Sequence, residues 1–395
     1  MIKAYRYKLK PNENQKIFFE KSFGCTRFVY NWALSKRIEA YQQEKKRLSC
    51  VGLCKLLTSI KKEEDKIWLN EVSAECLQQS IRNMDSAFTR FFREKKGFPK
   101  FKSKKDNQKS YKAINSVKVD FNSNKIQLPK IGWVSFYKNR TFEGKIGTVT
   151  VTKTATGKYY VSVLVDDGKE LPKKPDIKYD TTVGIDVGIK DFAVLSNGQV
   201  YENPKYLERA EQRLKVLQRR HSRKQKGSNR KENARIRLAR AYEKVTNCRK
   251  NFIHQVTSRI VRENQTVIIE DLNVNGMLKN HNLAKHISSA SWNEFFRQLQ
   301  YKCEWSGRNL LKIGRFEPSS KMCTCGYVNH ELKLSQREWT CPNCNQLNDR
   351  DLLAAIKRFG LQSQNLIGES PVVDGIVDVE WSAVAGAVKR QYVLL

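Results

Sequence analysis

The spacing of apolar residues changes twice along the first half of the chain. Residues 2–10 alternate between apolar and polar and predict a strand, whereas from Pro11 to about residue 95 apolar residues recur every three or four positions, as in helices. Between residues 116 and 166 the period becomes two, which predicts a small β-barrel or sandwich. The clearest helical repeat is a stripe that we interpret as core packing rather than base stacking, formed by Leu77, Ile81, Met84, Phe88 and Phe91.

A segment rich in proline and lysine at residues 166–180 has the composition of a linker, and it predicts a second domain after it. Apolar runs in that domain predict short buried strands at 182–189, 192–195 and 266–272. Between these strands, residues 204–262 predict a long helical hairpin. Its apolar seam consists of Ala234, Leu238, Ala241, Val245, Cys248 and Phe252.

The chain is strongly basic. Its 395 residues include 74 Lys and Arg against 40 Asp and Glu, which gives a formal net charge of +34. This excess favours a polyanionic partner, because each phosphate that a cation neutralises releases condensed counterions. A ribosome-associated protein or a generally basic surface would have the same composition, so charge alone does not indicate an enzyme. With no long apolar run and no secretory signal, the sequence predicts a cytoplasmic protein without a membrane partner.

Three acidic positions stand out from this basic background. Asp186 lies inside the apolar run 182–189, and Glu270 follows the run 266–269, at the strand end where α/β sheets place their sites. Asp349 and Asp351 open a segment of helical composition. Taken singly, each acid is consistent with a helix cap, a turn or an ion pair with a lysine.

The order of these acids along the chain indicates more than any one of them. Acids on a first strand, at the end of a later strand and on a late helix are typical of an RNase H-like fold. Carboxylates that meet at one point repel each other unless divalent cations bind there. Their oxygens favour Mg²⁺ or Mn²⁺, and two such ions activate a water and stabilise the leaving oxygen of a phosphodiester. The acids therefore predict metal-dependent cleavage of nucleic acid.

Four of the ten cysteines cluster in the sequence. Cys323 and Cys325 form one short pair, and Cys341 and Cys344 form a second pair after fifteen intervening residues. Two such knuckles predict a zinc ribbon, a closed four-cysteine site that stabilises a fold and takes no part in catalysis. A redox role for the pairs is the alternative. The other six are predicted to be small apolar residues of the interior: Cys25, Cys50, Cys54, Cys76, Cys248 and Cys303.

Two basic segments are candidates for contact with nucleic acid. In residues 97–105 aromatic residues interleave with lysines, and Pro99 excludes a continuous helix, so we expect a loop that follows a phosphate backbone. The candidate contacts there are Lys100, Lys102, Lys104 and Lys105. The tip of the predicted hairpin is the second segment, with Arg219, Arg220, Arg223 and Lys224 as candidate phosphate contacts.

In combination these segments resemble the TnpB family, transposon-encoded RNA-guided DNA nucleases related to type V CRISPR effectors. The resemblance covers most of the chain and is carried by residues 3–9, 24–34, 97–102, 184–188, 269–272, 318–321 and 349–351. It implies that Asp186, Glu270 and Asp351 are the catalytic acids and Mg²⁺ ligands. Asp351 is preferred to Asp349 because it directly precedes the segment Leu-Leu-Ala-Ala. The first knuckle departs from many relatives, which have C-x-x-C in place of C-x-C.

The resemblance also implies a multidomain fold of α/β and all-β parts. Residues 1–10 and 106–178 are expected to form a β-barrel wedge domain, and residues 11–105 a helical recognition domain. Residues 179–315 and 348–395 are expected to form an RNase H-like (RuvC-like) nuclease domain. A zinc-ribbon insertion that binds target nucleic acid is expected at 316–347.

The implied activity is RNA-guided DNA cleavage in a prokaryotic cytoplasm, at the nucleoid. The protein would bind a guide RNA as a monomer, recognise a short motif in double-stranded DNA, pair the guide with one strand and cut with two metal ions at one RuvC-like site. A guide-directed repressor that binds without cutting is one alternative, against which the presence of all three acids argues. A guide-independent RNase H or resolvase-type nuclease, or a transposase, is the other.

Overall fold

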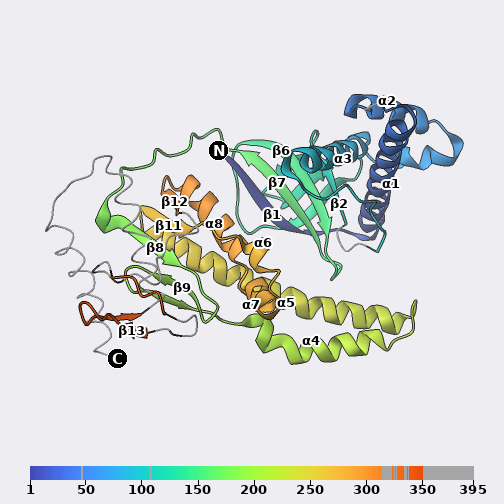
Figure 1. Ribbon diagram of the computed structural model, residues 1–395. Helices are drawn as coiled ribbons and strands as arrows, with labels where there is room; N and C mark the ends of the chain where they lie inside the picture. Colours follow the sequence, from blue (N-terminus) through green and yellow to red (C-terminus); the bar gives the residue numbers. More distant parts are fainter. Residues whose placement is uncertain are drawn as a thin grey trace. The chain divides into compact units, whose positions relative to one another are not determined.

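The computed structural model describes residues 1–45, 48–105, 109–313, 323, 325, 327–332, 336 and 338–349. These residues belong to two compact units that divide between Glu170 and Leu171 (Figure 1). Within the described part, every helix is too short or too polar to cross a bilayer.

The first unit is built on a seven-stranded sheet in the order β2-β6-β7-β1-β5-β4-β3, in which all neighbours are antiparallel. The strands are β1 (Ile2–Lys10), β2 (Lys109–Ala113), β3 (Lys118–Asp120), β4 (Lys125–Leu128), β5 (Gly132–Tyr137), β6 (Lys145–Lys153) and β7 (Tyr159–Asp166). The alternating pattern correctly predicted β1, and the antiparallel hairpin of β6 and β7 lies within the range 116–166 that it assigned to strands. This hairpin turns at Gly157, whose φ of 82° suits glycine.

Helices occupy the chain between β1 and β2. They are α1 (Glu13–Glu44), α2 (Cys50–Ile60), the 3₁₀ helix η1 (Glu64–Glu71) and α3 (Ala74–Glu94). Asn12 begins α1 with a capping box, since its side chain accepts from the Gln15 amide while the Gln15 side chain accepts from the Asn12 amide. The predicted stripe on α3 is confirmed as core, because Leu77, Ile81 and Met84 are fully buried in a cluster that includes the sheet.

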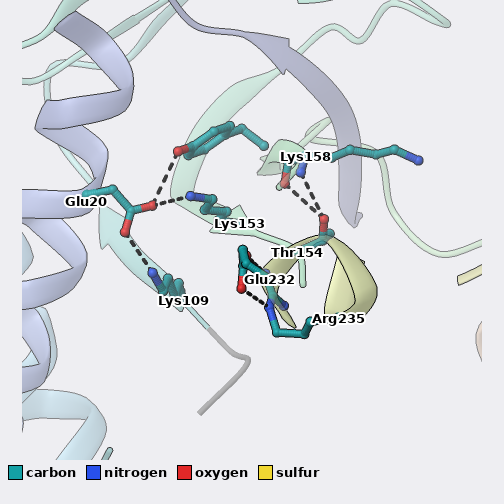
Figure 2. A network of polar contacts seen from close by, with 8 residues as sticks. Glu20, Lys109, Lys153, Thr154, Lys158, Glu232 and Arg235 are labelled. Carbon is teal, nitrogen blue, oxygen red and sulfur yellow. Dashed lines mark hydrogen bonds and ion pairs between the residues drawn. The ribbon is translucent and has the colours of Figure 1, made fainter. Parts of the chain in front are cut away.

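An ion-pair network joins α1 to the sheet (Figure 2). The Glu20 carboxylate accepts hydrogen bonds from Lys109 Nζ at 2.8 Å and Lys153 Nζ at 2.6 Å, and from the Tyr159 hydroxyl at 3.3 Å. Burial by itself would raise the pKa of Glu20, but the bonds and charges of the two lysines outweigh it, so the pKa lies below its ordinary value. One carboxylate therefore links α1 with β2, β6 and β7.

We expect Glu20→Gln to lower the free energy of unfolding by roughly 1–2 kcal/mol at pH 7, because two charged hydrogen bonds are lost at a half-exposed site. Since the folded-state pKa is lowered, this contribution is present above the ordinary value of 4.5 and is lost as the pH falls below it. Urea unfolding of both proteins at pH 7 and near pH 3 measures the difference. Glu13→Gln is the control, because Glu13 pairs with Lys16 on an exposed surface. An equal effect of both changes at pH 7 would contradict the assignment.

The second unit contains a five-stranded sheet in the order β10-β9-β8-β11-β12. Its strands are β8 (Thr182–Asp186), β9 (Asp191–Leu195), β10 (Val200–Glu202), β11 (Thr266–Glu270) and β12 (Asn309–Ile313), with η2 (Tyr179–Thr181) before them. β9 pairs antiparallel with both β8 and β10. β11 pairs parallel with both β8 and β12. The long connections between parallel strands are the helices that such a topology requires.

Those helices are α4 (Tyr206–Ser222), α5 (Asn229–Glu263), α6 (Val274–Met277), α7 (His281–Ala290) and α8 (Trp292–Trp305). One core packs α5 and α8 against the sheet through Ile260, Phe295 and Leu299. The predicted hairpin is confirmed as α4 and α5, which lie side by side as a long pair (Figure 1). Along its predicted seam only Val245 is buried, and the other five residues are half-buried. A short antiparallel pair, β13 (Glu338–Thr340) and β14 (Leu347–Asp349), completes the described elements.

Candidate metal sites and nucleic-acid surfaces

Asp186 and Glu270 end two neighbouring parallel strands. The register pairs Ile185 of β8 with Ile269 of β11, so the next residue on each strand is an acid. Neighbouring strands lie about 4.8 Å apart, and residues in register point to the same side of a sheet. The fold therefore brings together two acids that are separated by more than eighty residues in the sequence.

These two acids share the face of the sheet opposite to α5 and α8. Residues alternate along a strand, and Ile185 and Ile269 belong to the core that contains those helices. Asp186 and Glu270 therefore share the other face with Ile268, which packs with Ile313 in a separate small cluster. Both acids are half-buried, whereas the three residues before each of them are buried. A pair of carboxylates at a rim that solvent reaches suits ions that keep some water ligands.

The third predicted acid, Asp351, lies outside the described residues. Asp349 does not lie at a helix start, as its sequence context suggested, but in β14, where it pairs with Glu338 of β13. This pairing extends the cysteine-bearing hairpin two residues beyond the predicted end of the insertion at residue 347.

Gly184 and Gly188 flank Asp186, and a glycine within a strand indicates that another chain or a ligand approaches the backbone closely. For Gly188 the neighbour is this chain itself: an added Cβ would lie 2.8 Å from the carbonyl oxygen of Asp191. The turn from β8 to β9 therefore requires glycine at position 188 because of backbone packing.

The four predicted zinc ligands lie together. Their Sγ atoms are all within 4.8 Å of one another, and the Cys323–Cys344 and Cys325–Cys341 pairs are each 3.6 Å apart. A disulfide would require about 2.0 Å, whereas four sulfurs around a tetrahedral zinc at 2.3 Å lie about 3.8 Å apart. The cluster therefore fits zinc, and the C-x-C knuckle contributes both of its sulfurs despite the missing residue.

Two asparagines support this cluster, and sequence reasoning missed both. The Asn348 side-chain amide donates to Cys323 Sγ at 3.5 Å, and that of Asn343 donates to Cys325 Sγ at 3.6 Å. Such bonds orient thiolates and disperse their charge. Asn343 lies inside the second knuckle, so its position was a usable signal. Asn348 is brought to Cys323 only by the pairing of β13 with β14.

Two cysteines of the cluster have pKa values shifted in opposite directions. The backbone amide of Tyr327 lowers the pKa of Cys325 to about 6, which favours its thiolate. The backbone amide of Gln346 acts in the same direction on Cys344, but desolvation and the neighbouring sulfurs outweigh it and raise the pKa of Cys344 to about 12. Four thiolates at this spacing repel one another, and a bound cation removes that repulsion.

The predicted basic loop at residues 97–105 is held in place by α1. Asn31 donates its side-chain amide to the Lys102 carbonyl at 2.9 Å and accepts from the Lys102 amide at 2.8 Å. Lys102 Nζ lies 3.9 Å from the centre of the Tyr30 ring. Lys100, Lys104 and Lys105 are exposed.

A pocket of about 490 Å³, which we call the basic pocket, opens between α1, α3, this loop and β2. Among the described residues that line it, none is acidic, and five are cations: Arg27, Lys102, Lys105, Lys109, which is paired with Glu20 outside the lining, and Lys112. Tyr111 lines it as well, and no described group forms a hydrogen bond with its buried hydroxyl. Positive charge, hydroxyl groups and this volume suit a phosphate-bearing ligand.

The predicted contacts at the hairpin tip are exposed. Arg219 and Arg220 lie in the last turn of α4, Arg223 is its C-cap residue, and Lys224 follows. The Lys231 ammonium donates to the Lys224 carbonyl at 3.1 Å and helps to close the turn between the helices. These cations belong to the second unit, and those of the basic pocket belong to the first.

Three segments of the chain match protein-family models. Residues 160–281 match a family described as "Probable transposase", residues 1–46 a "Helix-turn-helix domain", and residues 292–357 a "Cas12f1-like, TNB domain". The described part of residues 1–46 consists of β1 and the 32-residue helix α1, so no second helix lies in it. The third segment includes α8, β12 and the cysteine cluster.

Solved structures share the fold at low identity. A "Cas12f1-sgRNA-target DNA complex" aligns with a TM-score of 0.55 and 16% identity, over 88% of this chain and 83% of that one. The "mini-RNA-guided endonuclease CRISPR-Cas_phi3" aligns with a TM-score of 0.51 and 8% identity, over 94% and 93%. At these identities the likeness shows the fold alone.

Curated relatives match nearly the whole chain. A protein of Streptomyces pristinaespiralis named "Putative RNA-guided DNA endonuclease" is 39% identical over 357 residues, which cover 89% of this chain and 87% of the relative. A protein of Escherichia coli with the same description and the name InsQ is 29% identical, over 90% and 92%. Since the first of these relatives is so similar over almost its full length, and since the matching segments include the transposase model, the chain belongs to the TnpB family.

Proposed function

We propose that this protein is an RNA-guided DNA endonuclease that binds a guide RNA, recognises a short motif in duplex DNA, pairs the guide with one strand and hydrolyses DNA at a single site. The observation that carries the proposal is the neighbouring position of Asp186 and Glu270 at the ends of two parallel strands. Relatives with this activity in their names support the guided DNA substrate. The protein would act as a monomer in the cytoplasm, at the nucleoid.

The catalytic residues in this proposal are Asp186, Glu270 and Asp351, which would together hold two Mg²⁺ or Mn²⁺ ions. Their carboxylate oxygens are the ligand type that these ions prefer. When bound, two such ions activate a water and stabilise the leaving oxygen of the phosphodiester. The acids themselves fix the position of the reaction, because β8 and β11 are anchored in a buried core up to the residue before each acid.

We assign the RuvC-like nuclease domain to residues 179–315 and 348–395. The sheet supports this assignment. Its first three strands along the chain are antiparallel and the next two are parallel, and they lie in the order third, second, first, fourth and fifth, as in RNase H-like folds. The zinc-ribbon insertion is assigned to residues 316–347. The wedge domain takes residues 1–10 and 106–178, and the helical recognition domain takes residues 11–105.

The basic pocket is the place where we expect the protein to hold duplex DNA beside the motif. It lies where the proposed recognition helices meet the proposed wedge sheet, and its lining includes two of the predicted contacts, Lys102 and Lys105. A cation-rich pocket without described acids binds phosphates with a strong dependence on salt. We assign the guide RNA to the remaining basic surface, including the hairpin tip with Arg219, Arg220, Arg223 and Lys224.

We expect the purified protein to retain a discrete RNA of on the order of a hundred nucleotides, because a surface this basic releases many counterions when it binds RNA. Removing that RNA should abolish Mg²⁺-dependent DNA cutting, and adding it back should restore cutting. Sequencing of the bound RNA and a plasmid-cleavage assay test this. Cutting that continues without RNA would indicate a guide-independent nuclease, and RNA-dependent binding without cutting would indicate a repressor.

A further inference from the structure

A second pocket, which we call the α1 pocket, lies on the face of α1 that carries Gly24, Phe28 and Trp32. These residues are four positions apart, so they share one side of the helix. The pocket has a volume of about 520 Å³, and Phe101 of the basic loop lines it together with this face. Nothing in the proposed catalytic site or the basic pocket uses its aromatic side chains.

The lining offers flat apolar surface to solvent. Phe101 is 57% exposed, so its ring is accessible to a ligand. Phe28 and Trp32 are half-buried, and the ring of Phe28 is fixed by edge contact with Trp68 at a centroid distance of 5.1 Å. Gly24 provides an open floor, because an added Cβ there would meet nothing within 4 Å.

The loop that carries Phe101 is held rigidly beside α1. The backbone N–H and C=O of the next residue, Lys102, both form hydrogen bonds with the side chain of Asn31. Asn31 itself lines the α1 pocket. The backbone next to Phe101 is therefore held in place before a ligand binds, which reduces the entropy lost on binding.

The charge around this aromatic surface is positive. Arg27 lines both the α1 pocket and the basic pocket, and Lys36 lies at the other end. Glu39 is the acid among the described lining residues; the Lys36 ammonium pairs with its carboxylate at 2.8 Å, and the Ser35 hydroxyl donates a hydrogen bond to it at 2.6 Å. A ligand that joins flat rings to negative charge fits both features, and a nucleotide of a nucleic-acid strand has this chemistry.

We propose that the α1 pocket takes an unpaired base of the DNA strand that opens beside the recognised motif. The inference rests on the proposed function, because a guide can pair with one strand only after the duplex next to the motif has opened. The shared Arg27 places an opened base next to the phosphates that the basic pocket would hold. Stacking between Phe101 and the aromatic face of α1 would offset part of the cost of unpairing.

The test uses the RNA-bound protein in an Asp186→Ala background, so that DNA binds without being cut. The probe is a cleavable duplex carrying 2-aminopurine at successive positions beside the motif, because stacking of an opened 2-aminopurine on aromatic rings quenches its fluorescence. We expect quenching at one position. Phe101→Leu, which keeps apolar bulk but removes the ring, should abolish that quenching and weaken DNA binding by roughly 5- to 150-fold.

Two matched controls separate stacking from folding. Gly24→Leu should fill the pocket and reproduce the loss, whereas Gly24→Ala improves helix propensity with little added bulk and should bind normally. Phe92→Leu changes a phenylalanine that is 73% exposed and does not line the pocket, so it should have no effect. An abasic nucleotide at the quenched position should weaken wild-type binding and remove the difference between wild type and Phe101→Leu.

Full binding and quenching in both Phe101→Leu and Gly24→Leu would overturn the inference. The inference would also be overturned if 2-aminopurine is quenched when it is placed in the guide RNA and not when it is placed in the DNA, because the occupant would then be RNA. Either result leaves RNA-dependent cutting by the unmodified protein unchanged. Absence of that cutting is what would refute the proposed function.

Discussion

Replacing Asp186 with alanine is expected to lower the rate of DNA cleavage by about 10³-fold or more, while guide RNA and DNA still bind. The change removes a carboxylate from the end of β8 next to Glu270, and the ions can no longer be held where the phosphodiester reacts. Binding should persist because the basic pocket belongs to the other unit. Single-turnover cleavage with saturating Mg²⁺ and filter binding of labelled DNA measure the two quantities.

The control is Asp176→Ala, which makes the same change in net charge at an exposed position outside the sheet. It should cut at the wild-type rate. Glu270→Gln should lower the cleavage rate about as much as Asp186→Ala does. The double variant should cleave little more slowly than either single variant, because the acids act as a unit. Normal cutting by Asp186→Ala would refute the assignment of the site.

Replacing Cys341 with serine is expected to remove the bound zinc and unfold the region around β13 and β14. Four sulfurs within 4.8 Å of one another form the site, and structural zinc contributes on the order of 10 kcal/mol to small zinc-binding folds. Wild-type protein should contain about one equivalent of zinc. Metal analysis, together with proteolysis of the region in the presence and absence of a chelator, measures both effects.

Cys248→Ser serves as the control, because this half-buried cysteine of α5 lies outside the cluster. It should retain zinc and resist proteolysis as the wild type does. A chelator should make the wild type resemble Cys341→Ser and should change that variant little. If Cys341→Ser remains zinc-free, folded and fully active, the cluster has no structural role.

Local patterns in the sequence were sufficient for most elements. The stripe on α3 and the alternation in β1, β6 and β7 predicted their class, because burial of one face imposes a period on a helix or a strand. The four cysteines were found in the same way, since the ligands of a zinc ribbon come from two short knuckles that are each local. The candidate acids were also visible, although each had an ordinary explanation.

Other features depend on contacts between distant parts of the chain. Nothing local distinguishes the strand arrangement of the first unit, where β1 pairs with β7 and β5 after a helical excursion of about a hundred residues. Asp349 looked like a helix cap but lies in β14, because pairing with β13 overrides local preference there. The two pockets combine α1 with residues some seventy positions later, so no sequence window contains them.

For the candidate metal ligands, some properties follow from the sequence and others from the tertiary structure. The sequence by itself determined that Asp186 and Glu270 are acids at apolar strands, that four cysteines have zinc spacing and that the chain has a formal net charge of +34. Only the tertiary structure decided that the two acids are neighbours, because parallel pairing of β8 with β11 in one register sets residue 186 beside residue 270. A shift of that register by one residue would turn one acid to the opposite face of the sheet, and burial of Val183, Ile185, Val267 and Ile269 in one core prevents it.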